Sequence, residues 1–175
     1  MRLRIPNEIF SSILAATTAF IGGNALHLPV WAIFIGWAAT YLAGGPQRAT
    51  FRALYPTMAA GATFALVIVL LDTALAPSDG QLAQNAVLAL LILVVNTALM
   101  YSGRTRLLAL IPGMFLGFAS YFATMFGGFG FAPENLLAAW VSVLVMLALG
   151  PLYALIAHAV TAPREERALE PADAR

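Results

Sequence analysis

Hydroxyl side chains stand beside glycines in two stretches of this sequence, and by residue type they are the groups best suited to hydrogen-bond a polar solute. The candidate residues in the two stretches are Gly36, Thr40, Tyr41, Gly113, Gly117, Ser120, Tyr121 and Thr124. In the second stretch, spacings of three and four residues keep most of them on one helical face. Small residues let two helix backbones approach closely, and hydroxyls can hydrogen-bond across the contact. These positions are therefore helix-crossing surfaces, the polar lining of a narrow pathway, or both at different depths.

Three further polar side chains fall inside or near apolar segments, and they are Asn24, Asp72 and Asn96. An amide in hydrocarbon needs a partner, so each Asn either makes an inter-helix hydrogen bond or belongs to a pathway. Asp72 lies shortly before Pro77, so its carboxylate either reaches the interface or a helix end, or it attracts cations or handles protons. His27 and His158 are expected at opposite membrane faces, and neither has a partner that would make it a ligand.

These residues do not form a catalytic constellation. The chain contains no Cys, which excludes disulfides, thiolate metal sites and cysteine nucleophiles. It also contains no glycine-rich phosphate loop, no HExxH motif and no GxSxG motif. We therefore expect no enzyme activity, no cofactor and no metal site.

The composition predicts a membrane protein that crosses the bilayer several times. Apolar residues make up 61% of the chain and charged residues only 10%, and the mean hydropathy is +0.86. A soluble domain has about a quarter charged residues. The net charge of +1 gives no reason to expect a nucleic-acid partner.

Six apolar segments follow one another along the chain. Their approximate limits are 9–26, 30–43, 54–75 or 57–75, 82–101, 107–128 and 136–160. We interpret the first as a retained helix rather than a signal peptide, because further spans follow it. The sequence thus predicts an all-α protein with a six-helix transmembrane domain over residues 1–162. Residues 163–175 form a charged tail without an apolar face, and we expect it to be disordered.

The arginines predict the orientation of these spans. With a cytoplasmic N-terminus, six spans place all nine basic residues in the inside segments and none in the outside loops. Basic segments resist translocation, so this distribution predicts that both termini are cytoplasmic.

An internal repeat is expected from the two glycine stretches, 34–45 and 111–128. Each contains an aromatic-apolar-Gly-aromatic core and ends on a Gly-Gly pair, and Gly117 follows Gly36 by close to half the chain length. Three spans per copy invert the second copy, so we expect a 3+3 inverted repeat with copies at about 8–76 and 81–161. Paired short or interrupted helices in such a repeat indicate a solute site near the bilayer midplane. If the two stretches serve only packing, the second and fifth helices are expected to cross through their glycines at the pseudo-twofold axis.

The same stretches carry a likeness to a known family. Residues 31–45 (WAIFIGWAATYLAGG), 57–69 and 111–123 (IPGMFLGFASYFA) resemble the YcdZ-like family of small bacterial inner-membrane proteins, domain of unknown function 1097. The likeness extends over about residues 24–160. It implies a six-span protein of the bacterial cytoplasmic membrane and brings no substrate or catalytic residue with it.

The preferred functional hypothesis is a passive channel or facilitator for a small neutral or weakly polar solute. Spans with so little charge are poorly equipped to couple transport to an ion gradient. The alternative is a non-transporting structural or accessory membrane protein whose small-residue seams serve assembly. A third hypothesis, an ion- or proton-coupled carrier, depends on Asp72. Six short spans make a thin bundle, so we expect a homo-oligomer in the lipid bilayer.

Overall fold

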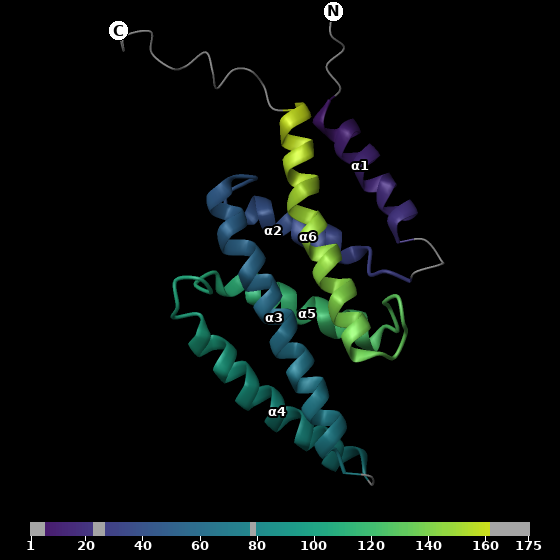
Figure 1. The fold of residues 1–175 in the computed structure, drawn as a ribbon, viewed down its shortest axis with the longest axis vertical. Coiled ribbons are helices and arrows are strands. Elements are labelled where there is room, and N and C mark those ends of the chain that lie inside the picture. Colours follow the sequence, from purple (N-terminus) through teal and green to yellow (C-terminus); the bar gives the residue numbers. More distant parts are fainter. Residues whose placement is uncertain (1–5, 23–26, 78–79, 162–175) are drawn as a thin grey trace, which may run out of the picture.

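The computed structural model describes residues 6–22, 27–77 and 80–161, and this part of the chain is entirely helical apart from its connections. The six helices are α1 (Asn7–Ile21), α2 (Trp31–Leu42), α3 (Arg48–Leu75), α4 (Gln81–Ser102), α5 (Ile111–Phe126) and α6 (Leu136–Thr161). Figure 1 shows α3 and α6 as the long rods of the molecule, with α2 and α5 lying across them. The all-helical fold expected from the apolar segments is confirmed.

Two helix starts differ from the predicted limits because of local breakers. Helix α3 begins at Arg48, directly after the Gly44-Gly45-Pro46 turn, and not at residue 54 or 57. Helix α5 begins at Ile111 instead of residue 107 and carries Pro112 in its first turn. Proline is tolerated there because a helix leaves its first N–H groups without an intrahelical acceptor.

Helix length divides the six into two groups. Helices α3, α4 and α6 contain 28, 22 and 26 residues and are long and apolar enough to cross a membrane. Helices α1, α2 and α5 are apolar but contain only 15, 12 and 16 residues. At 1.5 Å per residue, α2 rises only about 18 Å, against about 30 Å of hydrocarbon in a bilayer.

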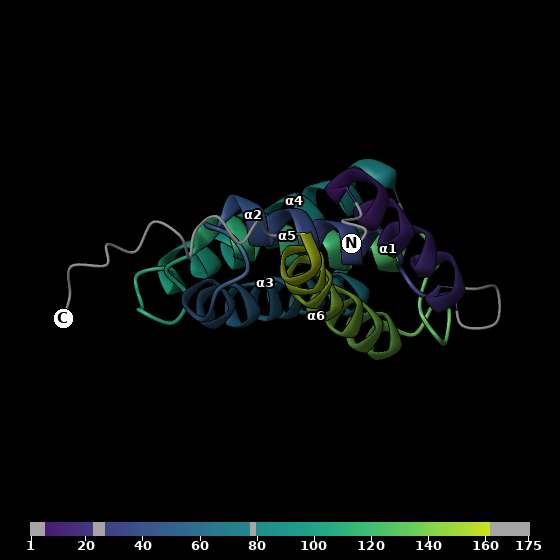
Figure 2. The same cartoon turned by 90° about the horizontal axis from the view of Figure 1, so that it is seen from above.

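The helices pack in two layers, with each short central helix against a long helix from the other half of the chain. Helix α5 packs mainly on α3, and α2 packs mainly on α6. In the view from above, α3 and α6 lie on one side of the molecule, and α2, α4 and α5 lie behind them (Figure 2). Helix α4 packs against α3, and α1 packs against α6.

Helix α1 is attached to α6 by hydrogen bonds at both of its ends. The hydroxyls of Thr17 and Tyr153 lie 2.7 Å apart, and Thr161 Oγ1 donates to Asn7 Oδ1 at 3.1 Å. The Tyr153 ring also meets Trp37 of α2 edge-on, with 5.6 Å between ring centroids. This contact joins α1, α2 and α6 into one packed group.

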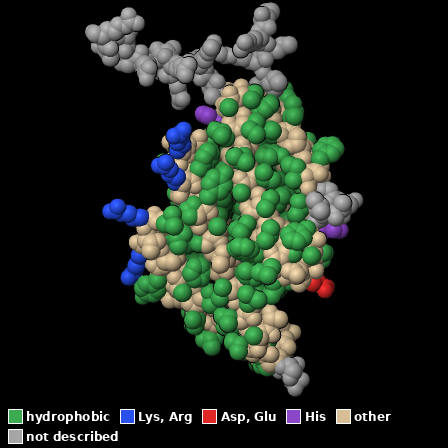
Figure 3. All heavy atoms as spheres, viewed as in Figure 1, with side chains coloured by type: hydrophobic (Ala, Val, Ile, Leu, Met, Phe, Trp, Pro, Cys, Tyr) green, Lys and Arg blue, Asp and Glu red, His purple; other side chains and the backbone are tan. Residues whose placement is uncertain are grey.

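Basic side chains and an acidic group lie at opposite edges of a largely apolar surface (Figure 3). The arginines of the described residues are Arg48, Arg52, Arg104 and Arg106, and all four are exposed. Figure 3 shows basic side chains along the left edge, where the α2–α3 and α4–α5 connections lie, and an acidic group at the right edge near the α5–α6 connection. We refer to these edges as the arginine-bearing face and the opposite face.

Candidate functional site

Glycines allow α5 and α3 to cross with their backbones in contact. A Cβ atom built on Gly117 of α5 would lie 2.7 Å from the carbonyl carbon of Met58, and one built on Gly61 of α3 would lie 2.7 Å from that of Met114. Real Cβ atoms essentially never come so close, and here the obstructing atoms belong to backbone. Any side chain at Gly61 or Gly117 would force the two helices apart.

Helices α2 and α6 cross in a closely related way. A Cβ atom on Gly36 would overlap the Leu147 carbonyl oxygen and lie 3.2 Å from Gly150 Cα, and one on Gly150 would lie 2.5 Å from Gly36 Cα. In both crossings the short helix places its glycine over the residue three positions before a glycine of the long helix, Leu147 before Gly150 in one and Met58 before Gly61 in the other. The short-helix glycine is therefore placed alike in the two crossings, whereas the long-helix glycines differ, since Gly61 faces Met114 and Gly150 faces Gly36 itself.

The expected crossing of α2 with α5 through their glycines is wrong. Gly36 faces α6 and Gly117 faces α3, and neither glycine lies against the other. Periodicity had identified which face of each short helix packs, but it contains no information about which helix that face meets. The glycines of the long helices, Gly61 and Gly150, were not singled out from the sequence.

A weak signal could have identified these two partners. The pattern Ala-x-Gly-x-x-aromatic-Ala-Leu occurs at residues 59–66 and again at 148–155. Each copy centres on the long-helix glycine of one crossing. The pattern lies inside continuous apolar runs with no break in hydropathy. It can therefore be recognised only when the two halves of the sequence are aligned.

Four of the five hydroxyls proposed as pathway groups are fully buried, and three of these four are satisfied within the protein; the four are Thr40, Ser120, Tyr121 and Thr124. Thr40 Oγ1 donates to the Gly36 carbonyl at 2.8 Å, and Thr124 Oγ1 donates to the Ser120 carbonyl at 2.7 Å. Tyr121 donates to the Leu136 carbonyl of α6 at 3.2 Å. Ser120 is also fully buried, and its Oγ has no hydrogen-bond partner.

Gly113, the remaining small residue of the α5 stripe, lies against a side chain. A Cβ atom added there would overlap Thr57 Oγ1 and lie 3.2 Å from Thr57 Cβ. The Thr57 hydroxyl donates to the carbonyls of Ala53 and Leu54 in its own helix. Gly113 therefore extends the α3–α5 contact beyond the backbone crossing at Gly117.

Tyr41 and Tyr121 occupy different environments. With Gly36 and Gly117 in register, Thr40 corresponds to Tyr121, and each is fully buried. Tyr41 is one residue further along and is 48% exposed, since one residue turns a helix by about 100°. The two tyrosines therefore do not face a common space.

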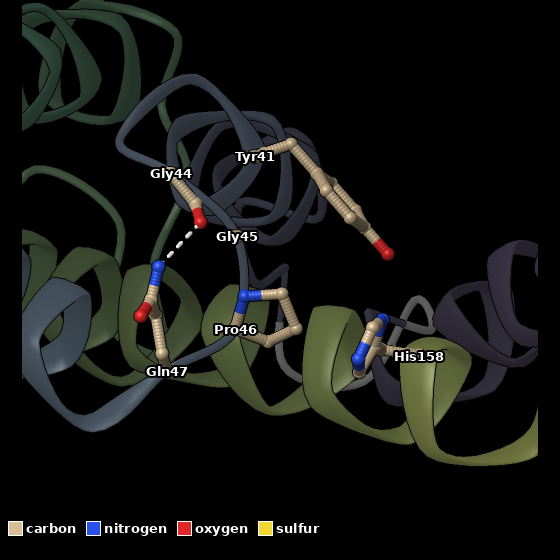
Figure 4. A pocket seen from close by; sticks show the side chains of 6 residues that line it. All are labelled: Tyr41, Gly44, Gly45, Pro46, Gln47 and His158. Carbon is tan, nitrogen blue, oxygen red and sulfur yellow. Dashed lines mark hydrogen bonds between the residues drawn. The ribbon is translucent and has the colours of Figure 1, made fainter. Parts of the chain in front are cut away.

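Tyr41 instead borders a polar hollow at the arginine-bearing face. The Tyr41 hollow has a volume of about 600 Å³ and is lined by Tyr41, Gly44, Gly45, Pro46, Gln47 and His158. Figure 4 shows the Tyr41 hydroxyl pointing toward the side of the hollow where α6 carries His158. Gln47 Nε2 donates to the Gly44 carbonyl at 2.7 Å across the turn.

A second hollow lies between the last turn of α2 and the first turn of α5. We call it the α2–α5 hollow. Its volume is about 280 Å³, and it is lined by Ala39, Leu42, Ala43, Leu54, Leu110, Pro112, Gly113 and Leu116. Every lining side chain is apolar, so the space suits a molecule without charge.

Of the three polar candidates near the spans, Asp72 and Asn96 lie apart from both hollows. Asp72 stands in the last turn of α3 and is half-buried, and its Oδ1 has no hydrogen-bond partner. Asn96 Oδ1 on α4 is likewise buried without a partner. Asn24 lies outside the described residues. In the ranges that the structure describes, no three His, Cys, Asp or Glu side chains come together as a metal site would require.

The helices and their crossings indicate the class of protein, and a comparison with known families gives the family. The apolar helices indicate a membrane protein with small-residue crossings at its centre. Residues 9–162 match the family described as "Protein of unknown function (DUF1097)", and the chain belongs to that family. The resemblance to domain of unknown function 1097 is confirmed. No curated protein and no solved structure matches the chain.

Proposed function

We propose that this protein is a passive facilitator for a small neutral or weakly polar solute in the bacterial cytoplasmic membrane. In this proposal six spans form a 3+3 inverted repeat, with both termini and the arginine-bearing face in the cytoplasm. The observation that carries the proposal is that both short central helices, α2 on α6 and α5 on α3, place a glycine over the backbone three residues before a glycine of the long helix.

This arrangement is explained if helices are exchanged between the two copies of the repeat. If α2 corresponds to α5 and α3 to α6, each crossing joins the short helix of one copy to the long helix of the other. The outer helices follow the same rule. If α1 corresponds to α4, each of them packs on the long helix of the other copy, α1 on α6 and α4 on α3. Inverted repeats with short central helices are typical of transporters that bind solute near the midplane.

We infer an uncharged solute because the spans offer few charged side chains to pair with it. The arginines of the described residues stand at connections or in the first two turns of α3, and the α2–α5 hollow has only apolar side chains. A charged solute would lose its hydration without gaining an opposite charge, which costs several kcal/mol or more. Neutral solutes avoid most of this cost, and their movement needs no ion gradient.

Short helices are compatible with six spans because a bilayer can adapt to them. A short apolar segment is accommodated by local thinning or by oligomerisation at modest cost. Helices α1 and α4 each pack mainly on one neighbour, so they leave wide apolar faces for lipid or for further copies of the chain. We therefore include a homo-oligomer in the proposal.

The alternative, a structural or accessory membrane protein without transport, is favoured by one specific observation. The hydroxyls of Thr40 and Thr124 are fully buried and bond to carbonyls of their own helices. Groups satisfied in this way serve packing without any solute.

Flux into liposomes separates the two functions. Purified protein in liposomes is challenged with urea, glycerol and 1-butanol, and swelling is followed by light scattering. We expect at least one solute to enter faster than into protein-free vesicles, and Thr124→Val to change that rate. Thr97→Val is the matched control, because Thr97 makes the same hydrogen bond to its own helix on the exposed side of α4. Equal rates with and without protein for every solute would support the structural alternative.

A further inference from the structure

The two ends of the central helix pair differ, although the proposed repeat would make them alike. At the arginine-bearing face, the α2–α5 hollow leaves Ala43 and Leu110 half-buried. With the crossing glycines in register, these residues correspond to Thr124 and Pro29 at the opposite face, and both of those are buried. The space between α2 and α5 is thus open at one face and filled at the other.

The connection between α5 and α6 accounts for the filled end. It runs from residue 127 to 135, whereas the corresponding connection between α2 and α3 runs only from 43 to 47. Phe129 in the longer connection meets Trp31 edge-on, with 4.3 Å between ring centroids. The Gly130 N–H donates to the His27 carbonyl at 2.8 Å, which joins the α1–α2 and α5–α6 connections.

Two polar atoms are buried without partners in this filled end. Ser120 Oγ has no hydrogen-bond partner although Ser120 is fully buried, and Trp31 Nε1 is buried without an acceptor. Ser120 corresponds in register to Ala39, which lines the α2–α5 hollow at the other end. A buried hydroxyl without a partner is destabilising, and a polar group of a bound molecule would remove that cost if this end opened.

We propose that the α2–α5 hollow is a binding site for a small, neutral, largely apolar molecule carrying one polar group, open to the arginine-bearing face and closed from the opposite face by residues 127–135. This inference rests on the proposed transport function, and it names the site and the chemical class of the solute. The apolar lining of the hollow takes the carbon skeleton of the solute. Ser120 offers a hydrogen bond to the polar group when the opposite end opens.

The dimensions of the hollow limit the size of the solute. An apolar cavity of about 150 Å³ can hold benzene, and the α2–α5 hollow measures about 280 Å³. Carboxylates and amines are excluded by charge, because no lining side chain can pair with them. Short-chain alcohols meet both limits, so 1-butanol is the probe.

Single cysteines test the site directly, because the chain contains no Cys of its own. Ala43→Cys places a thiol in the hollow, and Thr124→Cys places a near-isosteric one at the corresponding closed position. Thr105→Cys, exposed in the α4–α5 connection, is the matched control outside the hollow. The full-length protein is labelled in vesicles of either orientation with a membrane-impermeant methanethiosulfonate, with and without 1-butanol, butyrate or butylammonium.

We expect Ala43→Cys to react from the arginine-bearing face and Thr124→Cys to be unreactive from the opposite face. The reaction of Ala43→Cys should be lost as 1-butanol is added, whereas butyrate, butylammonium and the Thr105→Cys control show no such loss. If Thr124→Cys does not fold, Ser120→Cys replaces it.

The inference is overturned if Ala43→Cys is unreactive, if 1-butanol leaves its rate unchanged, or if butyrate protects equally well. None of these readouts measures transport. Protection without flux in liposomes would retain the site and refute the proposed function, and flux with an unprotected Ala43→Cys would do the reverse.

Discussion

Gly117→Ala adds one methyl group at the α3–α5 crossing and tests the packing on which the architecture depends. The added carbon would lie 2.7 Å from the carbonyl carbon of Met58 and overlap its oxygen. Both obstructing atoms belong to a helix backbone, so no side-chain rotation relieves the contact. The helices must separate, and the opposing contact of Gly61 with Met114 loosens with them.

The size of the loss follows from two opposing terms. Overpacking a well-packed contact costs about 1–3 kcal/mol, and backbone obstruction places this site at the upper end of that range. Alanine is favoured over glycine in a helix by about 1 kcal/mol. We therefore expect a net loss of about 2 kcal/mol, which raises the unfolded fraction by up to about 30-fold.

The free energy of unfolding can be measured by SDS titration of the detergent-solubilised protein, with helicity followed by circular dichroism. Gly113→Ala is the matched control on the same helix, because its nearest obstruction is the Thr57 side chain and not a backbone atom. Its loss should be smaller than that of Gly117→Ala. A Gly117→Ala protein as stable as the wild type, or more stable, would refute the backbone-contact crossing.

Three further substitutions have defined outcomes. Tyr153→Phe removes the hydrogen bond to Thr17 and keeps the ring, so the free energy of unfolding should fall by about 1 kcal/mol in the same SDS titration. Phe129→Ala removes the edge-on contact with Trp31, which should cost about 0.5–1.5 kcal/mol beyond lost area and make Ser120→Cys reactive from the opposite face. Asp72→Asn should leave solute flux unchanged in liposomes, and a loss of flux would instead support the coupled carrier.

The sequence was sufficient to predict the helices themselves. Apolar runs separated by Gly-Gly-Pro at 44–46 and by the charged and glycine-rich connections gave six segments, and the structure has six helices in the ranges it describes. Helix starts were less accurate, since Arg48 and Arg52 look like a polar connector although they occupy the first two turns of α3. Arginine has high helix propensity, and its long stem can follow an apolar surface.

The partner of each helix could not be predicted from periodicity. Gly36 and Gly117 were recognised as packing residues, but their contacts with Gly150 and Met58 depend on how distant segments meet. Tyr41 and Tyr121 were both proposed as pathway groups, but they lie one position out of register when Gly36 and Gly117 are aligned, and in a helix one position changes the face. The α2–α5 hollow was missed for a different reason, because its apolar lining cannot be distinguished from ordinary core in a sequence this apolar.

The inverted arrangement of the two halves is the central claim, and side-specific labelling tests it most directly. Gln47→Cys and Pro133→Cys place single exposed thiols in the two corresponding connections, 43–47 and 127–135. An impermeant maleimide applied to intact cells should label Pro133→Cys and leave Gln47→Cys unlabelled, and inverted membrane vesicles should give the opposite result. Labelling of both thiols from the same side of the membrane would contradict the inverted repeat.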